Sequence, residues 1–415
     1  MSLRVMLVSL RRHGLMPSLV FLQVAVACAI LCNVSFLAWQ RLEPMLAPSG
    51  VDADNLILID NLAPVHGVWS AAESQAAEEA FRGVPGVRAA SAAFGLPMVS
   101  MMSMEFHLQG PTKSTADVNA FMGKGLIDTL GLQLIAGRDF LPEEYRPFGV
   151  GAKNDNAKWD DGVPEPVIIT QALARKLFGA SQPLGGMLGD PTDPGSYRVV
   201  GVVRHLLRNE LSLATDGQAD DTVLIPRSIG NTAILSYAIR VEPAMHDAAM
   251  RGVKQVVKSQ FGPRTENGPQ ARVEWHNDKR EEALASSRAA LWLLLGLVLA
   301  VIVVTVVGIM GLTGFWVQRR TRQIGIHRAL GARRVDILRY FLAENALIVC
   351  AGVVVGMVLA YGGNTMLMHY YELPHLPWIY LPVGGLAMLL MGQLSVFVPA
   401  LRAAAVPPVV ATRSV

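Results

Sequence analysis

The chain has 415 residues, 52% of them hydrophobic and 17% charged, and its mean hydropathy is +0.36. Because an average soluble domain is about 25% charged, this composition excludes a wholly soluble protein and predicts a membrane protein with a large soluble part. The formal net charge of +3 gives no support to a nucleic-acid-binding protein.

Four segments lack Asp, Glu, Lys and Arg for about 20 residues or more, the length that crosses about 30 Å of hydrocarbon. They predict transmembrane helices at 18–40, 289–318, 345–368 and 378–401. The first segment is longer than the apolar part of a signal peptide and has no small-residue cleavage site, so we expect a retained anchor. The second is longer than a bilayer requires, and we expect one of its ends to project into water.

The placement of arginine and lysine predicts an orientation. Basic residues occur in 1–17, in 319–344 with seven arginines, and in the tail 402–415, but not in the short segment 369–377. Because short loops rich in these residues stay in the cytoplasm, the first three segments are predicted to be cytoplasmic and the fourth external. The large region 41–288 then lies outside, with a net charge of −6 against +10 for the three cytoplasmic segments.

The region 41–288 has the pattern of an α+β domain. Two β-α-β units, at about 50–115 and 231–276, flank an insertion at about 116–230 that contains strand and helix fragments between Gly and Pro turns. The predicted fold class is therefore a membrane protein with four transmembrane α-helices and a large α+β extracytoplasmic domain inserted between helices 1 and 2. The polar segment 276–288 is expected to continue straight into the second transmembrane helix as a stalk.

Sequence motifs of several catalytic sites are absent from the chain. The phosphate-binding loop G-x-x-x-x-G-K-[ST] does not occur, since Gly123–Lys124 has no Gly at 118 and no following Ser or Thr. No H-E-x-x-H, C-x-x-C or G-x-S-x-G is present. His276 and Asp278 are close in sequence, but a solvated face of the stalk explains them better than a metal site. We therefore predict a non-catalytic chain with no metal and no cofactor of its own.

A methionine cluster occurs in PMVSMMSM. Its members Met98, Met101, Met102 and Met104 could hold Cu(I) through their thioethers. The commoner use of methionine is adaptable apolar packing or contact with a greasy ligand, and that reading is favoured here.

The predicted membrane helices contain no charged residue, which argues against an ion-coupled carrier. Gly352 and Gly356 form a G-x-x-x-G in the third helix, a spacing that permits close helix packing. Ordinary glycine enrichment in membrane helices explains the pair equally well.

The segment RRTRQIGIHRALGARRVDILRYFLAEN, residues 319–345, has apolar residues at helical spacing on both sides of Gly331. It predicts a helix, a glycine turn and a second helix at the inner membrane surface. Its charge suits either contact with anionic lipid or docking of a cytoplasmic partner, and charge alone does not choose between them.

The sequence of this segment closely resembles that of the cytoplasmic loop of FtsX-like permeases, the membrane subunits of MacB-type ABC systems. The tail PALRAAAVPPVVATRSV resembles the end of that family, and GLQLIAGRDF, VIITQALARKLFG, QPLGG and YRVVGVV resemble its periplasmic core domain. Four helices with the large domain between the first and second match the family's topology. Two positions depart from its pattern: Gln323 stands where Glu is usual, and Ala332 where Ser often begins the next helix.

The resemblance implies a permease subunit of the inner membrane, with a periplasmic domain, that works with a separate ATP-binding ABC ATPase. Motion would pass from the ATPase through the membrane helices to the periplasmic domain, driving efflux of peptides, antibiotics or lipid-linked cargo. A second permease copy or a sister permease is implied as a partner, and a periplasmic adaptor and an outer-membrane channel are further candidates. The residues that the resemblance assigns to ATPase coupling are Arg322, Gln323, Ile324, Gly325, Arg328, Ala329, Leu330 and Gly331.

Two other functions stay open from the sequence. The same fold could transmit force to a periplasmic hydrolase or sensor without moving cargo. A membrane-anchored enzyme would need a convergent polar site in 41–288, and none is evident.

Overall fold

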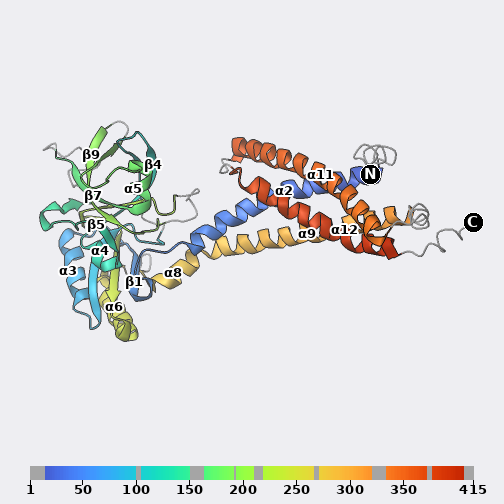
Figure 1. The fold of residues 1–415 in the computed structure, drawn as a ribbon. Coiled ribbons are helices and arrows are strands. Elements are labelled where there is room, and N and C mark those ends of the chain that lie inside the picture. Colours follow the sequence, from blue (N-terminus) through green and yellow to red (C-terminus); the bar gives the residue numbers. More distant parts are fainter. Residues whose placement is uncertain are drawn as a thin grey trace, which may run out of the picture. The chain divides into compact units, whose positions relative to one another are not determined.

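A computed structural model of the chain describes residues 15–99, 104–149, 163–190, 193–209, 218–265, 271–319, 333–371 and 376–405. They belong to two compact units, which we describe separately (Figure 1). The membrane unit comprises Met1–Glu43 and Ser287–Val415, and the exported unit comprises Pro44–Ser286.

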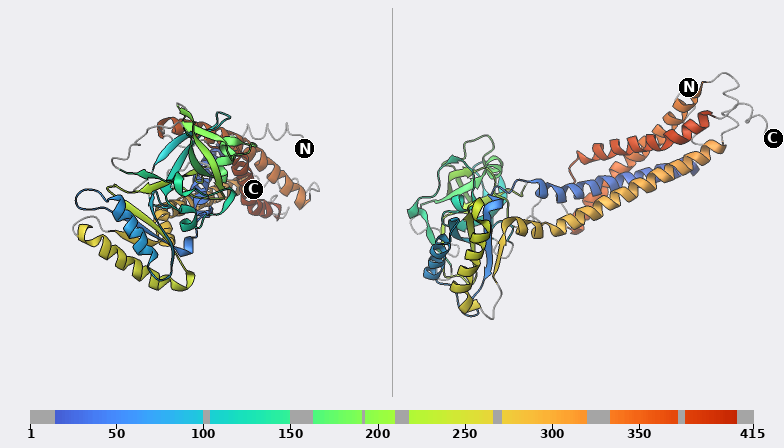
Figure 2. Two further views of the ribbon diagram at one scale, coloured as in Figure 1. Left: turned by 90° about the vertical axis from the view of Figure 1, so that its left-hand side faces the viewer. Right: turned by 90° about the horizontal axis from the view of Figure 1, so that it is seen from below.

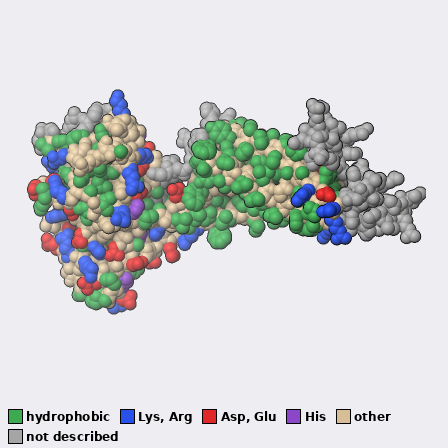
Figure 3. Space-filling model, viewed as in Figure 1, with side chains coloured by type: hydrophobic (Ala, Val, Ile, Leu, Met, Phe, Trp, Pro, Cys, Tyr) green, Lys and Arg blue, Asp and Glu red, His purple; other side chains and the backbone are tan. Residues whose placement is uncertain are grey.

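Within its described residues, the membrane unit contains four long helices. They are α2 (Leu15–Leu46), α9 (Ala285–Arg319), α11 (Arg334–Tyr371) and α12 (Tyr380–Ala405). Each is long and apolar enough to cross a membrane. The side chains on the visible face of these helices are mainly hydrophobic (Figure 3), as expected where lipid replaces water around a protein.

Helix α11 differs from what the arginine-rich segment predicts. The part of that segment after Gly331 was expected to form a separate helix at the membrane surface. Instead, α11 runs without interruption from Arg334 to Tyr371, so the basic residues Arg334 and Arg339 lie in the first turns of a membrane helix. The apolar positions Ile337 and Phe341 of that stretch are buried in the core of the helix bundle, which explains why the helix continues.

The exported unit combines a sheet with several short helices. The strands of the sheet are β1 (Leu56–Leu62), β2 (Val87–Phe94), β3 (Glu105–Gln109), β4 (Thr115–Gly123), β5 (Leu134–Gly137), β7 (Glu165–Thr170), β8 (Met187–Asp190), β9 (Asp193–Val203), β10 (Thr222–Ile225), β12 (Leu235–Val241) and β13 (Arg272–Trp275). Strands β6 (Arg146–Phe148) and β11 (Arg227–Ile229) pair with each other. The helices are α3 (Ala71–Arg82), α4 (Leu126–Leu130), α5 (Gln171–Phe178), α6 (His246–Gln260), α7 (Gly262–Thr265) and α8 (His276–Ala283).

The two predicted β-α-β units interleave into one antiparallel sheet. Its strand order is β2-β12-β1-β13, so each unit places one strand between the two strands of the other. This is the arrangement of a split β-α-β fold. Helices α3 and α6 run side by side (Figure 2). A capping box starts α3, with the Ser70 hydroxyl accepting from the Glu73 amide and the Glu73 carboxylate accepting from the Ser70 amide.

The inserted lobe is a ring of strands that closes on itself. In order around the ring, β4, β3, β8, β9, β7 and β10 each pair with the next, and β10 returns to β4 in parallel register, with Val223 opposite Ala120. Closure leaves these strands without a free edge. The strand in MEFHLQG, predicted to belong to the first β-α-β unit, is β3 and lies in this ring. The first unit therefore ends at β2 and not near residue 115.

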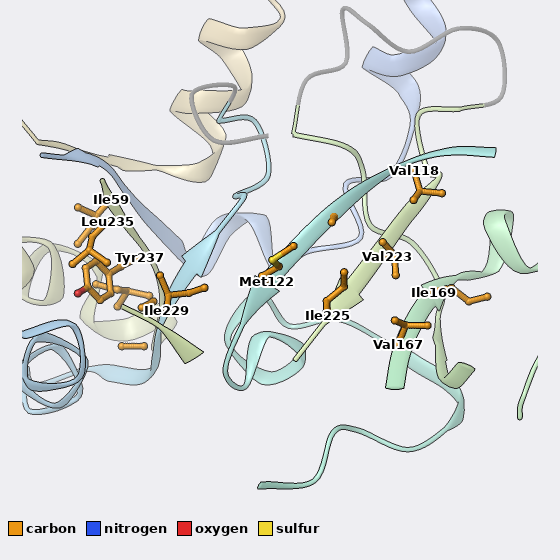
Figure 4. Packing of buried hydrophobic residues seen from close by; sticks show 14 of the residues in the cluster. Ile59, Val118, Met122, Val167, Ile169, Val223, Ile225, Ile229, Leu235 and Tyr237 are labelled. Carbon is orange, nitrogen blue, oxygen red and sulfur yellow. The ribbon is translucent and has the colours of Figure 1, made fainter. Parts of the chain in front are cut away.

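One hydrophobic core runs through both parts of the exported unit. Figure 4 shows Ile59, Leu235 and Tyr237 of the interleaved sheet, and Val118 and Val223 of the ring. All five are essentially inaccessible to solvent. The exported unit contains no cysteine, so its stability comes from this packing and from hydrogen bonds and ion pairs.

Candidate functional site

The predicted ATPase-coupling residues lie outside the described part of the chain. They fall between the described residues 319 and 333: Arg322, Gln323, Ile324, Gly325, Arg328, Ala329, Leu330 and Gly331. The helices on either side of them are described. Helix α9 ends at Arg319, whose guanidinium lies 4.8 Å from the ring centre of Phe315. At the start of α11, the Arg333 amide donates to Oδ2 of Asp336 at 3.0 Å, which caps the helix.

The two glycines of the predicted packing motif lie against α2. A Cβ on Gly352 would be 2.8 Å from Cγ1 of Val24. A Cβ on Gly356 would be 2.7 Å from the carbonyl oxygen of Ala25. Real side chains do not tolerate these separations, so α11 and α2 approach as closely as they do because glycine occupies both positions.

Glycines also line other helix contacts in the membrane unit. A Cβ on Gly384 of α12 would lie 2.5 Å from Sγ of Cys32 on α2, and one on Gly308 of α9 would lie 2.2 Å from Nε2 of Gln23. Helix α2 is thus approached by glycines of α9, α11 and α12. Half of its most apolar stretch is buried, against 11% for α9.

Side-chain amides join the helices at the same contacts. Nδ2 of Asn33 on α2 donates to the carbonyl of Ala360 on α11 at 3.2 Å, and Nδ2 of Asn345 donates to the carbonyl of Gly392 on α12 at 3.1 Å. Nε2 of Gln23 donates to the carbonyl of Val304 at 3.1 Å. Interhelical hydrogen bonds of this kind stabilise packing in lipid. They were not predicted, because only charged residues and glycines of the membrane segments were considered from the sequence.

Helix α9 is the least enclosed of the four helices. Many of its large apolar side chains, including Trp292, Leu293 and Leu299, are exposed within this single chain. Beside Gln23, a cavity of about 260 Å³ separates α9 from α2 and is lined mainly by aliphatic side chains such as Ile30 and Val301. The Gln23 hydrogen bond therefore crosses a contact that is only partly packed.

In the exported unit, the best-defined polar cluster surrounds α8. Nζ of Lys279 lies 3.0 Å from Oδ2 of Asp60 on β1 and 3.1 Å from Oε2 of Glu274 on β13. Oε2 of Glu282, one turn along α8, is 3.8 Å away. The side chains of Lys279 and Asp60 are only 8% and 6% exposed. Burial opposes the charge on Lys279, but the carboxylates of Asp60 and Glu274 outweigh it and raise the pKa of the lysine.

The neighbouring residue Arg280 points to a different segment. Its Nη2 donates to the carbonyls of Met45 and Ala47, at 3.2 and 2.9 Å, where the chain leaves α2. Leu284, which follows α8, packs in a small apolar cluster with Met98. We call this set of contacts around α8 the stalk junction, consisting of Asp60, Glu274, Lys279, Arg280 and the segment 45–47.

The position of His276 differs from the prediction made for the stalk. It was predicted to lie on a solvated face, but its side chain is completely buried. Burial and the nearby positive charge of Arg280 lower the pKa of His276 to about 4, so the imidazole is neutral at neutral pH. Neither ring nitrogen makes a hydrogen bond of normal geometry with a described residue. The sequence HNDKREEA looks fully polar, and its buried face depends on strands far away in the chain.

A metal site is not evident in the parts of the chain that the structure describes, where no three His, Cys, Asp or Glu side chains converge. Of the methionine cluster, Met98 packs near Leu207 and Met104 packs against the main core. Met101 and Met102 lie outside the described residues.

Comparison with known proteins relates the membrane helices, and most of the chain, to one group. Residues 295–408 match the family described as FtsX-like permease C-terminal. The chain is 30% identical over 261 residues to the pyoverdine export ATP-binding/permease protein PvdT of Pseudomonas aeruginosa, which covers 61% of this chain and 38% of that protein. It is 30% identical over 209 residues to the macrolide export ATP-binding/permease protein MacB of Bdellovibrio bacteriovorus, a match that covers 48% of this chain and 31% of that protein.

A third relative matches over a longer range. The uncharacterized ABC transporter permease YknZ of Bacillus subtilis is 25% identical over 351 residues, covering 83% of this chain and 80% of that protein. The matches thus span about a third of the length of the first two relatives and most of the third.

Proposed function

We propose, from the premise that this chain belongs to the FtsX-like permeases of the MacB type, that it transmits ATP-driven conformational change across the membrane. Permease subunits of this family are generally non-catalytic. In our proposal a separate cytoplasmic ABC ATPase binds and hydrolyses ATP, and the residues 322–331 contact it. The exported unit then changes position or shape and drives efflux.

The observation that carries the proposal is the attachment of α8. Helices α8 and α9 are separated only by Leu284, whose backbone angles of −90° and −3° are still helical. Helix α8 is bound to β1 and β13 through Lys279, and through the next residue, Arg280, to the segment at the end of α2. Motion of α9 along its axis would therefore reach the exported sheet through a short, polar and tightly bonded connection.

The membrane helices support this mechanism over an intramembrane carrier. The stretches 18–40, 289–318, 345–368 and 378–401 contain no Asp, Glu, Lys or Arg, and the charged residues of α11, including the buried Glu344, lie in its first three turns. Carriers that couple to protons or ions place such residues along their pathway. The polar side chains at the described helix contacts instead donate to backbone carbonyls, as Asn33 and Asn345 do.

The names of the relatives support a proposal about cargo and partners. Two of them carry pyoverdine export and macrolide export in their names, together with an ATP-binding part. We propose that this chain serves peptides, antibiotics or lipid-linked cargo, and that it works as a pair with a second permease. It lies in the inner membrane with both termini in the cytoplasm and the unit 44–286 in the periplasm. A periplasmic adaptor and an outer-membrane channel would complete an efflux route.

The test is a distance measurement in the complex with the ATPase. Spin labels on A76C of α3 and I379C, between α11 and α12, would be introduced in a C350A background, since Ala76 and Ile379 are exposed. We expect ATP binding to shift the label-to-label distance in a hydrolysis-deficient complex. A distance that is the same with and without ATP contradicts the proposal.

A further inference from the structure

The stalk junction holds a buried charge, the ammonium group of Lys279. We propose that Lys279 is a positioning residue that locks α8 to the exported sheet, so that displacement of α9 moves the sheet and is not lost as rotation of α8 against it. This inference rests on the proposed function and names the contact through which the motion passes.

The geometry of Lys279 suits a lock between three chain segments. Asp60 and Glu274 belong to adjacent strands, because β1 and β13 pair with Leu58 opposite Glu274. One ammonium group therefore connects two neighbouring strands to the helix. It does so at 8% exposure, where water and salt screen the attraction much less than at the surface.

The chemistry of the cluster points to positioning and not only to stability. A buried ion pair is often no more stabilising than apolar residues of similar size, because both charges lose their hydration. What it enforces is a fixed geometry, since any rotation that separates the ammonium from Asp60 leaves two buried charges uncompensated. An apolar contact at the same place would allow α8 to slide or rotate at little cost.

A second observation supports the same role. Lys279 and Arg280 are adjacent on α8, project about 100° apart around its axis and bind different segments, Lys279 the sheet and Arg280 the carbonyls of Met45 and Ala47. Helix α8 is therefore fixed about its own axis by two charged groups. Oδ1 of Asp60 and Nε of Arg280 are buried and make no hydrogen bond to described residues.

The experiment compares variants in the full chain bound to its ATPase, using the A76C and I379C label pair. K279M keeps the length of the side chain and removes its charge, and K254M on the exposed face of α6 is the matched control. We expect K279M to bind the ATPase and hydrolyse ATP at the unaltered rate, while the ATP-dependent change in distance is reduced several-fold. K279R should restore most of the change, and K254M should leave it intact.

The outcomes separate the two proposals. If the unmodified chain shows no ATP-dependent change in distance, the proposed function fails. If the unmodified chain and K279M show the same change, the positioning role of Lys279 is refuted while the function stands. If K279M does not fold, as judged by proteolysis of the full chain, D60N replaces it, because it removes the buried partner of Lys279 while Glu274 still compensates the charge of the lysine. A full-sized distance change in D60N would then refute the role, and a reduced one would support it.

Discussion

Nε2 of Gln23 on α2 donates to the carbonyl oxygen of Val304 on α9 at 3.1 Å, beside a glycine, Gly308, that leaves room for the amide. The most apolar stretch of α9 is the least buried among the four membrane helices described, and a cavity lies next to this contact. Substitutions at the contact between Gln23 and α9 are therefore expected to loosen the packing of α9 against α2.

Replacing Gly308 with leucine should weaken this contact modestly. The new side chain would meet the far end of the flexible Gln23 side chain, which can move aside and lose its hydrogen bond. Interhelical hydrogen bonds in membranes average about 0.6 kcal/mol, and we expect the free energy of unfolding in detergent to fall by a similar amount. G311L is the control, because a Cβ on Gly311 meets no atom within 4 Å. Equal effects of the two variants would contradict the assignment.

Replacing Gly356 with leucine should be more damaging. Here the new Cβ would meet the carbonyl oxygen of Ala25, and a backbone cannot move aside as a side chain can. We expect a loss of about 1–3 kcal/mol in the free energy of unfolding, as for other overpacked sites. The matched control is G363L on the same helix, where nothing lies within 4 Å of a Cβ. If G363L destabilises the protein as much as G356L does, the tight contact between α11 and α2 is not what the glycine protects.

His276 should make the exported unit sensitive to acid. Its pKa falls from 6.5 in the unfolded chain to about 4 in the folded one, so the unfolded state binds the proton more readily. Stability is then unaffected above about pH 6.5 and is lost as the pH falls toward 4, by about 3 kcal/mol in all. The measurement is the free energy of unfolding against pH for the unmodified chain, for H276L and for H66Q, which changes an exposed histidine.

The H276L variant should lose less stability between pH 6.5 and 4 than the unmodified chain, whereas H66Q should follow the unmodified curve. Parallel curves for all three proteins would show that His276 is not the group that titrates.

Much of the fold could be predicted from local pattern. Charge-free stretches of membrane length indicated four helices, because only such stretches can remain in hydrocarbon. Alternating strand and helix signals around NLILID and ILSYAIRV indicated the β-α-β units, and the structure forms β1 and β12 at these places.

Features that depend on distant residues could not be predicted in the same way. The ring closes because β10 pairs with β4, about 100 residues earlier in the chain. No local pattern in the sequence indicates this pairing. His276 looked solvated because the segment HNDKREEA is polar throughout, whereas the burial of His276 and Lys279 depends on residues far away in the chain. The amide contacts of Gln23 and Asn33 could have been found by treating any amide in an apolar stretch as a candidate interhelical donor.

The central claim is that this chain works with a separate ATPase through its arginine-rich segment. The most direct test is affinity purification in mild detergent through a C-terminal tag, with identification of the partner chains and an assay of ATP hydrolysis. R328E, in the segment 322–331, would be purified in parallel, with R339A in the first turns of α11 as a control. We predict that an ATP-hydrolysing partner accompanies the unmodified chain and R339A, and that R328E loses it. Recovery of the chain without any ATPase, or an undiminished ATPase with R328E, would contradict the account.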